Sequence, residues 1–291
     1  LIFRELLILR MVNILVPTDF SQLSKSALKY AIKIANKLGG NVTVLHVITM
    51  SRAWRVTMVE KIRSFDHDMI ESAGVELETM IKTLSEQYKS SKPIRGQVVR
   101  GAYFASTLLR EARRLHSGLI VMGTRGASGL TKAVMGSNTN SVIEVSHVPV
   151  LAVPEKADFK GFRNVVYASD LRNLQEELEI LVRYIEKFGS TIHLIHIVPP
   201  GQQVDLVEAN IELVLKKFSY KNIITLVLVD NDVNSALEHY VEVSRADVLA
   251  MFTHEISFFE KVFDRSMTRK MAFQSRVPLL AFRQMEPERG L

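Results

Sequence analysis

The sequence predicts an α/β protein made of two tandem domains, each built on an open parallel sheet with helices on both faces. Three observations support this prediction. Short, strongly apolar runs that are typical of buried strands alternate with segments of helical periodicity along the chain. The pattern of the first half recurs in the second half. The length of 291 residues suits two domains of about 145 residues each.

The first half begins with a short buried strand at residues 12–16, which a proline and two turn residues end. A helix is expected over 22–38, because its apolar residues recur at the spacing of one helical face and two glycines follow it. The later elements are strands at 42–47, 94–99, 118–122 and 148–153, a mostly helical segment at 55–90, and helices at 104–115 and 137–146. Such apolar strands between helices indicate a parallel sheet that is covered on both faces.

The second half repeats this order of elements, which indicates an internal duplication. The equivalent segments are 13–19 with 164–170, 43–47 with 193–197, 118–122 with 247–251, and 148–153 with 277–282. The second copy is shorter than the first, mainly in its middle.

The domain boundaries follow from the repeat. We expect a first domain at 11–154, a linker near 154–162 and a second domain at 162–291. Residues 1–10 are expected to be an upstream extension, since Met11 stands immediately before the first strand. They are apolar and partly basic, but they lack the long apolar core and the small-residue cleavage site of a signal peptide.

The composition narrows the function classes. A hydrophobic content of 47% and a charged content of 23% are ordinary for a soluble globular protein, and no run approaches the ~20 apolar residues of a membrane helix. The chain has no cysteine, which excludes disulfides, thiolate nucleophiles and cysteine-ligated zinc and is consistent with a cytoplasmic location. The net charge of +6 is spread along the chain. Its densest clusters, at 110–114 and 216–217, do not form the stripe of basic and aromatic residues that nucleic-acid binders show. A solvated surface is therefore favoured over nucleic-acid binding.

The strongest chemical signal follows the strand at 118–122. Glycines stand at 123, 126, 129 and 136, and a helix begins at Ser137. Glycine lets the backbone approach a ligand without interference from a Cβ, and the free N–H groups at a helix start favour an anion. A turn or a helix end would explain each glycine alone. The whole group at a strand–helix junction favours a phosphate-binding loop.

Polar residues around this run would complete the site. The hydroxyls of Ser137 and Thr139 and the amide of Asn138 add neutral donors, and Arg125 adds a cation. Asp19 ends the first strand at the same carboxyl edge of the sheet, where its carboxylate could accept a hydrogen bond from a ribose hydroxyl. A local role in an Asx turn or in capping the next helix explains Asp19 equally well.

Other motifs are excluded or carry little weight. The loop lacks the Gly-Lys-Ser/Thr of a Walker A motif, and the first strand is not followed by a dinucleotide fingerprint. His193 and His196 lie three apart on a strand, so they face opposite sides and do not form a metal site. His46 and His196 recur at equivalent strand ends, which indicates packing or a hydrogen bond there. The acidic residues are interpreted as solvated helix faces, and none is a candidate catalytic base.

Three segments resemble the universal stress protein family. The spacing Gly-x2-Gly-x9-Gly-Ser at 123–137 resembles its nucleotide-binding signature, and residues 14–21 and 146–153 resemble its first and last strands. The resemblance covers nearly the whole chain as two copies. It implies a five-stranded parallel sheet of order 3-2-1-4-5 in each half, of the adenine nucleotide alpha hydrolase-like kind. It also implies ATP, with or without Mg²⁺, in the crevice between strands one and four.

The resemblance also assigns the site residues. Pro17, Thr18 and Asp19 would contact the nucleoside, with Asp19 near the ribose, and the backbone of Val47 would pair with adenine. Arg125 would lie close to the phosphates. The residues that would hold the phosphates are Gly123, Gly126, Gly136, Ser137, Asn138 and Thr139. Family members commonly dimerise through the last strand, so the two halves are expected to pack as a pseudo-dimer, and further homodimerisation stays open.

The second copy departs from the signature. Aligned on a shared methionine, it has Phe252, Glu255 and Arg265 in place of three glycines, and only Ser266 keeps its hydroxyl. A phenylalanine and a glutamate would block backbone approach and repel an anion, although Asp170 persists. We therefore expect one ATP site per chain, in the N-terminal half, with a structural or regulatory C-terminal half.

The function that the sequence favours is that of an ATP-binding stress-response or signalling protein. One alternative is a slow ATPase or phosphotransferase. The missing Walker lysine, catalytic carboxylate and metal set argue against efficient turnover. The other alternative is a nucleotide-independent interaction scaffold, against which the intact N-terminal loop argues.

Overall fold

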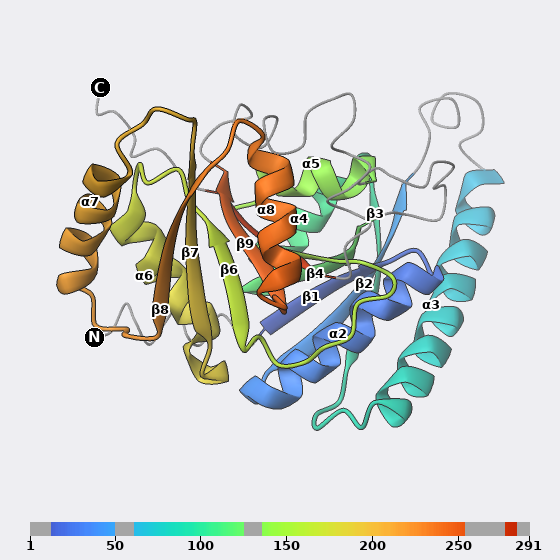
Figure 1. The fold of residues 1–291 in the computed structure, drawn as a ribbon. Coiled ribbons are helices and arrows are strands. Elements are labelled where there is room, and N and C mark those ends of the chain that lie inside the picture. The colour runs from blue at the N-terminus through green and yellow to red at the C-terminus, as the bar shows by residue number, and fades with distance from the viewer. Residues whose placement is uncertain (1–12, 50–60, 125–135, 254–276, 284–291) are drawn as a thin grey trace. The chain divides into compact units, whose positions relative to one another are not determined.

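The structure is a computed structural model that describes residues 13–49, 61–124, 136–253 and 277–283 (Figure 1). The chain divides into two compact units, with the boundary between Lys156 and Ala157. Both units are α/β, which confirms the predicted fold class. No helix in the part of the chain that the structure describes combines the length and the apolar character that crossing a bilayer requires.

Unit 1 alternates strands and helices from its start to its end. Its elements are β1 (Asn13–Thr18), α2 (Gln22–Leu38), β2 (Asn41–Thr49), α3 (Lys61–Gln87), β3 (Arg95–Gly101), α4 (Phe104–Arg114), β4 (Leu119–Gly123), α5 (Ser137–Val145) and β5 (Val150–Val153). The strands are parallel and are paired in the order β3-β2-β1-β4-β5. Helices cover both faces of this sheet, with α2 and α3 on one face and α4 and α5 on the other (Figure 1).

Unit 2 repeats this arrangement. Its elements are β6 (Asn164–Ala168), α6 (Leu174–Ile185), the 3₁₀ turn η2 (Glu186–Phe188), β7 (Thr191–Val198), α7 (Val204–Lys216), β8 (Ile223–Val229), α8 (Val233–Val243), β9 (Val248–Thr253) and β10 (Leu279–Arg283). Its parallel strands are paired in the order β8-β7-β6-β9-β10. When each unit is numbered by itself, both orders read 3-2-1-4-5, as the family resemblance implies.

Local sequence signals set the bounds of α2. Ser21 is its N-cap, with a side-chain oxygen that accepts a hydrogen bond from the N–H of Ser24. Gly39 ends the helix with a φ of 68°, a left-handed conformation that glycine adopts without steric cost. The apolar face between these caps is buried and packs against β1 and β4. These contacts place the start of α2 beside the carboxyl end of β1.

The predicted end of the first strand at residue 16 is wrong, because β1 continues through Pro17 to Thr18. Pro17 lies in register with Leu45 of β2, whereas the β1 residues in register with β4 are Ile14 and Leu15. A proline near the end of a strand, beyond one of its two pairings, is compatible with the ladder. Most other boundaries in unit 1 differ from the prediction by one or two residues. The helix expected within 55–90 is α3, and residues 50–60 lie outside the described part of the chain.

Candidate functional site

A cavity of about 560 Å³ opens in unit 1, where the carboxyl ends of β1, β2, β3 and β4 meet the first turns of α4 and α5. This edge of an open parallel sheet is where ligands commonly bind. The lining residues are Pro17, Thr18, Asp19, Ser24, His46, Val47, Thr49, Ala102, Tyr103, Phe104, Ala105, Met122, Gly123, Asn138, Thr139 and Ser141.

The structure brings together most of the site residues expected from the sequence. Those that line the cavity are Pro17, Thr18, Asp19, Val47, Gly123, Asn138 and Thr139. Gly136 and Ser137 stand at the start of α5 but are not among the lining residues. Arg125 and Gly126 lie outside the described residues, as does Gly129.

Sequence reasoning missed the segment that follows β3. All four residues from Ala102 to Ala105 line the cavity, and Tyr103 is 67% exposed. None of these four residues is a glycine or an acidic residue, so no motif in the sequence marks them. The signal that could have found them is topological. Parallel strands end at one edge, so the segment after the third strand lies beside the segments after the first and the fourth.

Asp19 closes the turn that follows β1. Its Oδ1 accepts hydrogen bonds from the backbone N–H of Ser21 at 3.1 Å and from the Ser21 hydroxyl at 2.5 Å. Phe20, between them, has a φ of 63°. The local Asx turn that the sequence left open is therefore present, and it holds an exposed carboxylate at the rim of the cavity.

A histidine joins the ends of β1 and β2. The Nδ1 of His46 lies 2.9 Å from the carbonyl oxygen of Thr18, and because a carbonyl only accepts, this nitrogen carries the proton. The same bond recurs in unit 2, where the Nδ1 of His196 lies 2.8 Å from the carbonyl oxygen of Ser169. The sequence left packing or a hydrogen bond open for these two histidines, and the structure shows a hydrogen bond at both strand ends.

His193 behaves differently from His196, as their spacing predicts. Its Nδ1 lies 2.9 Å from the hydroxyl of Tyr240 on α8, and burial lowers the pKa of the His193 imidazole. Within the described ranges, no group of three or more histidine, aspartate or glutamate side chains is arranged to hold a metal ion.

The first turn of α5 faces the cavity. The N–H of Gly136 donates to the carbonyl of Thr124 at 2.7 Å, which joins the two ends of the 125–135 segment. Thr139 is 2% exposed, and its hydroxyl donates to the carbonyl of Gly123 at 2.8 Å. This hydrogen bond fixes the first turn of α5 to the end of β4. The first-turn N–H groups of α5 have no acceptor inside the helix, and they are the groups for which the sequence predicts anion binding.

Gly123 has a packing role that the sequence did not reveal. A Cβ at this position would lie 2.5 Å from Cγ of Leu23 and 3.3 Å from its carbonyl oxygen. The glycine therefore lets the start of α2 lie against the end of β4. Because both elements border the cavity, this close approach shapes the site.

The register of unit 2 identifies the residue equivalent to Gly123. Leu119 pairs with Ile14 in unit 1 and Val248 pairs with Val165 in unit 2, so Phe252 occupies the position of Gly123. Phe252 is 3% exposed. Its ring stacks on Phe282 with centroids 4.6 Å apart and meets Tyr167 edge-on at 5.8 Å. The replacement of glycine by phenylalanine thus fills the core of unit 2 with aromatic contacts.

The turn after β6 is also altered. Asp170 accepts a hydrogen bond from the N–H of Arg172, as Asp19 does from Ser21 in unit 1. The Nε of Arg172 lies 3.4 Å from the second carboxylate oxygen of Asp170. The aspartate after the first strand of unit 2 therefore takes part in an ion pair with Arg172.

The interpretation of the acidic residues as solvated helix faces is wrong for two helices. Glu111 on α4 is 6% exposed and Glu177 on α6 is 1% exposed. Glu177 accepts a hydrogen bond from the hydroxyl of Tyr167. Burial, reinforced by this carboxylate, raises the pKa of Tyr167. The partners come from other elements or from neighbouring turns, so periodicity alone could not identify them.

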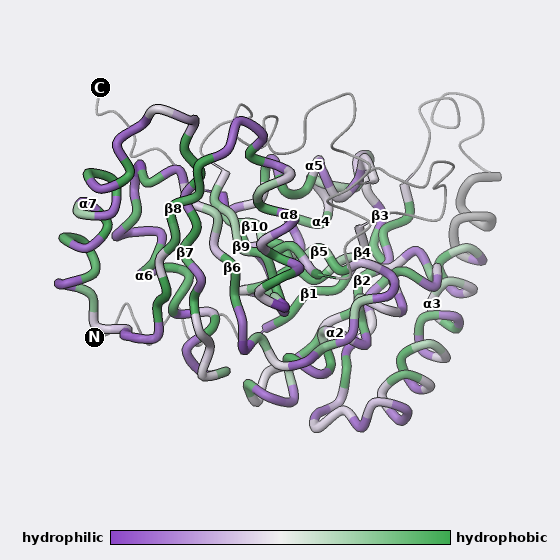
Figure 2. The backbone as a smooth tube through the Cα atoms, viewed as in Figure 1, coloured by the Kyte–Doolittle hydropathy of each residue, from purple (hydrophilic) through white to green (hydrophobic). Residues whose placement is uncertain are grey.

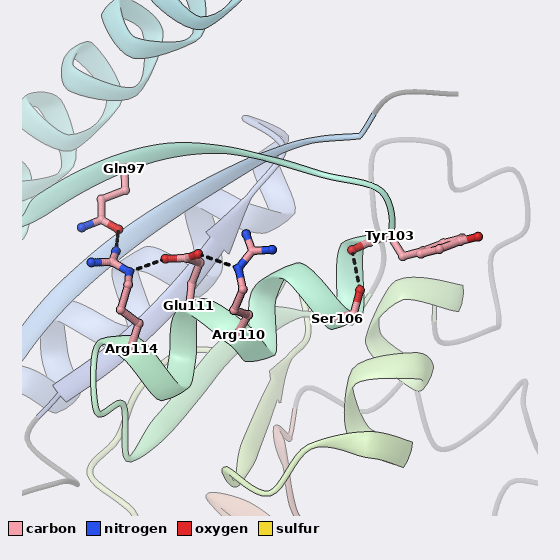
Figure 3. Close-up of polar contacts among 6 residues, drawn as sticks. All are labelled: Gln97, Tyr103, Ser106, Arg110, Glu111 and Arg114. Carbon is pink, nitrogen blue, oxygen red and sulfur yellow. Dashed lines mark hydrogen bonds and ion pairs between the residues drawn. The ribbon is translucent and has the colours of Figure 1, made fainter. Parts of the chain in front are cut away.

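Glu111 anchors the helix that carries the missed segment (Figure 3). Its carboxylate accepts hydrogen bonds from Arg114 Nε at 2.6 Å and from Arg110 Nε at 3.1 Å. Arg114 also donates to Oε1 of Gln97 on β3 at 2.6 Å. The side chain of Tyr103 points away from this cluster at the other end of α4 (Figure 3). The cluster ties the last turn of α4 to the start of β3, the two elements that residues 102–105 connect.

We expect Glu111→Gln to lower the free energy of unfolding by about 1 kcal/mol near neutral pH, because charge-assisted bonds to partly exposed arginines are lost. The hydrogen bond from Arg114 lowers the pKa of Glu111 below its ordinary 4.5. Its contribution is therefore fully present above pH 4.5 and is lost as the pH falls through the folded-state pKa. Urea unfolding across this range should show the two proteins converging in acid. Glu76→Gln, at an exposed position on α3, is the control, and an equal effect there would contradict this role.

Comparison with known proteins gives consistent matches. A sequence model of the universal stress protein family matches residues 11–154. Universal stress protein MJ0531 of Methanocaldococcus jannaschii is 30% identical over 141 residues, which are 48% of this chain and 81% of that protein. Universal stress protein Slr1230 of Synechocystis is 23% identical over 294 residues, covering 94% of this chain and 100% of that protein. The crystal structure of a universal stress protein from Archaeoglobus fulgidus shares the fold, with a TM-score of 0.69 and 20% identity over 94% of this chain and 99% of that chain.

Proposed function

Because this chain belongs to the universal stress protein family, we propose that it is a stress-response protein that binds ATP in the cavity of unit 1. The observation that carries the proposal is the cavity itself. Its volume of about 560 Å³ is within the range of small-molecule sites, and it lies at the carboxyl edge of the parallel strands.

The groups around the cavity fit the parts of an adenine nucleotide. The exposed carboxylate of Asp19 is an acceptor for ribose hydroxyls, and the backbone of Val47 at the end of β2 supplies donors and acceptors for adenine. The first-turn N–H groups of α5 and the side chain of Asn138 suit the phosphates. Arg125 and Gly126 are proposed to complete the phosphate site, and Mg²⁺ would accompany the phosphates if it is required.

We further propose that each chain binds one nucleotide. In unit 2 the position of Gly123 holds the buried ring of Phe252, and Asp170 is paired with Arg172. In the sequence, the charged residues Glu255 and Arg265 stand at the positions of Gly126 and Gly136. Both lie outside the described part of the chain. The C-terminal domain, proposed at 162–291, would then support or regulate the nucleotide-binding domain at 11–154 as its pseudo-dimer partner.

The direct test is mass spectrometry of protein that is purified without added nucleotide, followed by calorimetric titration of stripped protein with ATP. We expect an adenine nucleotide to co-purify and ATP to titrate to one equivalent per chain. Two equivalents of similar affinity would contradict the single site. The absence of both co-purified and titratable nucleotide would reject the proposal.

The substitution Asn138→Asp is expected to change ATP binding and helix stability in opposite directions. A carboxylate in the first turn of α5 should stabilise the helix by about 0.3–1 kcal/mol through the helix dipole, while it repels phosphates and weakens ATP binding about tenfold. Asn173→Asp is the matched control, because Asn173 is the N-cap of α6 in unit 2 and makes no side-chain capping bond. Thermal unfolding and ATP titration of both variants check the prediction. Unchanged affinity in Asn138→Asp, or weakened affinity in Asn173→Asp, would place the phosphates elsewhere.

A further inference from the structure

β8 is an edge strand with an unusual composition. Among the strands that the structure describes within unit 2, it pairs only with β7. Its seven residues, Ile-Ile-Thr-Leu-Val-Leu-Val, include no charge, no proline and no glycine. Figure 2 colours this strand as predominantly hydrophobic. Edge strands in monomeric proteins usually carry charges or other features that prevent pairing with a second chain.

The edge strand of unit 1 has such protection and β8 has less. β3 carries Arg95 and Arg100, and it packs against α3, a helix of 27 residues. The helix beside β8 is α7, which has 13 residues. On β8 itself, Ile224 is 51% exposed and Val229 is 52% exposed.

The backbone pattern shows which residues face the open edge. The N–H of Ile192 donates to the carbonyl of Asn222 at 2.9 Å, and the N–H of Asp230 donates to the carbonyl of Val198 at 2.9 Å. In a parallel ladder alternate residues bond to the same neighbour, so the even-numbered residues from 222 to 230 bond to β7. The odd-numbered residues, which include Thr225 and Val227, direct their N–H and C=O groups away from it.

We propose that β8 is a homodimerisation edge, at which the β8 strands of two copies of this chain pair antiparallel about a two-fold axis. The occupant is a second copy because the strand is complementary to itself. In an antiparallel register centred on Leu226, Thr225 lies opposite the second copy's Val227, and the strand contains no charges to repel. Lys221 stands before the strand and Asp230 and Asp232 stand after it, so antiparallel pairing brings residues of opposite charge to the same end of the interface.

Exposed leucines beside this edge support the proposal. On α7, Leu206 is 60% exposed and Leu213 is 59% exposed, and the two lie seven residues apart on one face of the helix. Because α7 packs against β8, a second copy at this edge would bring further apolar surface to these leucines. The interface is of the small, weak class, with an expected dissociation constant on the order of 10 µM.

The first test is sedimentation velocity of the full chain over a range of concentrations. We expect a reversible dimer. Thr225→Lys adds like charges on the two sides of the two-fold axis, and Val227→Pro removes an outward N–H while it leaves the β7 ladder intact. Each variant should weaken dimerisation at least about tenfold, whereas Val243→Lys, at a 64% exposed valine on α8, should not. Circular dichroism verifies folding, and Thr225→Lys carries the test if the proline variant is unfolded. A wild-type chain that stays monomeric, or a dimer that resists Thr225→Lys, overturns the proposal.

The second test uses the absence of cysteine from the chain. Leu226→Cys would face its own counterpart across the axis, where a non-hydrogen-bonded antiparallel pair has a Cα–Cα distance of about 4.5 Å that a disulfide can span. Under mild oxidation we expect a covalent dimer that reductant reverses. Val243→Cys is the control for random collision, and equal cross-linking of the two variants would count against pairing through β8.

Discussion

Gly101→Ala is expected to lower the free energy of unfolding by about 3 kcal/mol, the largest effect of any single methyl group that we predict. A Cβ at Gly101 would lie 2.7 Å from Cβ and 2.8 Å from Cγ2 of Thr107, and closer still to its hydroxyl oxygen. Thr107 is 1% exposed, so it has no space into which to move. The new methyl group must therefore push the first turn of α4 away from the end of β3.

This displacement should also reach the candidate site. Gly101 directly precedes residues 102–105, which line the cavity. We expect the variant to bind ATP more weakly, at a temperature where it is still folded. Gly74→Ala is the matched control, because Gly74 is inside α3 and nothing lies within 4 Å of its added Cβ. That variant should be more stable by about 0.5–1 kcal/mol, since alanine favours the helix. Chemical denaturation of both variants checks the prediction, and a Gly101→Ala protein as stable as the wild type would contradict the close packing.

Gly123→Ala is expected to lower the free energy of unfolding by about 1–3 kcal/mol, because its Cβ would overlap Leu23. The two residues should be coupled. In a chain that already carries Leu23→Ala, the same glycine substitution should cost much less, which gives a coupling energy of about 1–2 kcal/mol in a double-mutant cycle.

The same cycle distinguishes two roles for this glycine. If Gly123 serves the approach of α2, the doubly substituted protein should bind ATP with nearly wild-type affinity. If the glycine serves close contact between the backbone and phosphate, affinity should fall in both backgrounds alike. We expect the first result, because the space that a Cβ would need is filled by Leu23. Strictly additive stability effects would show that the two residues do not compete for that space.

The comparison of Gly123 with Phe252 also shows how the packing of the two units differs at this position. In unit 1 the glycine leaves room for Leu23, and in unit 2 the phenylalanine packs against Phe282 and Tyr167. The space at the end of the fourth strand is therefore filled by Leu23 in unit 1 and by Phe252 in unit 2. In unit 2 the buried ring of Phe252 thus occupies the position at which unit 1 has a glycine that lines the cavity.

The sequence by itself determined the alternation of strands and helices, the duplication and the edge of the sheet at which to look for a site. These properties depend on periodicity and on local signals such as Ser21 and Gly39, which act within a few residues. Only the tertiary structure decided what depends on contacts between distant segments. It brought residues 102–105 to the cavity, buried Glu111 beside arginines and showed that Gly123 accommodates Leu23. The physical reason is that burial and steric exclusion are set by whichever element lies opposite, and a pattern along one segment does not contain that partner.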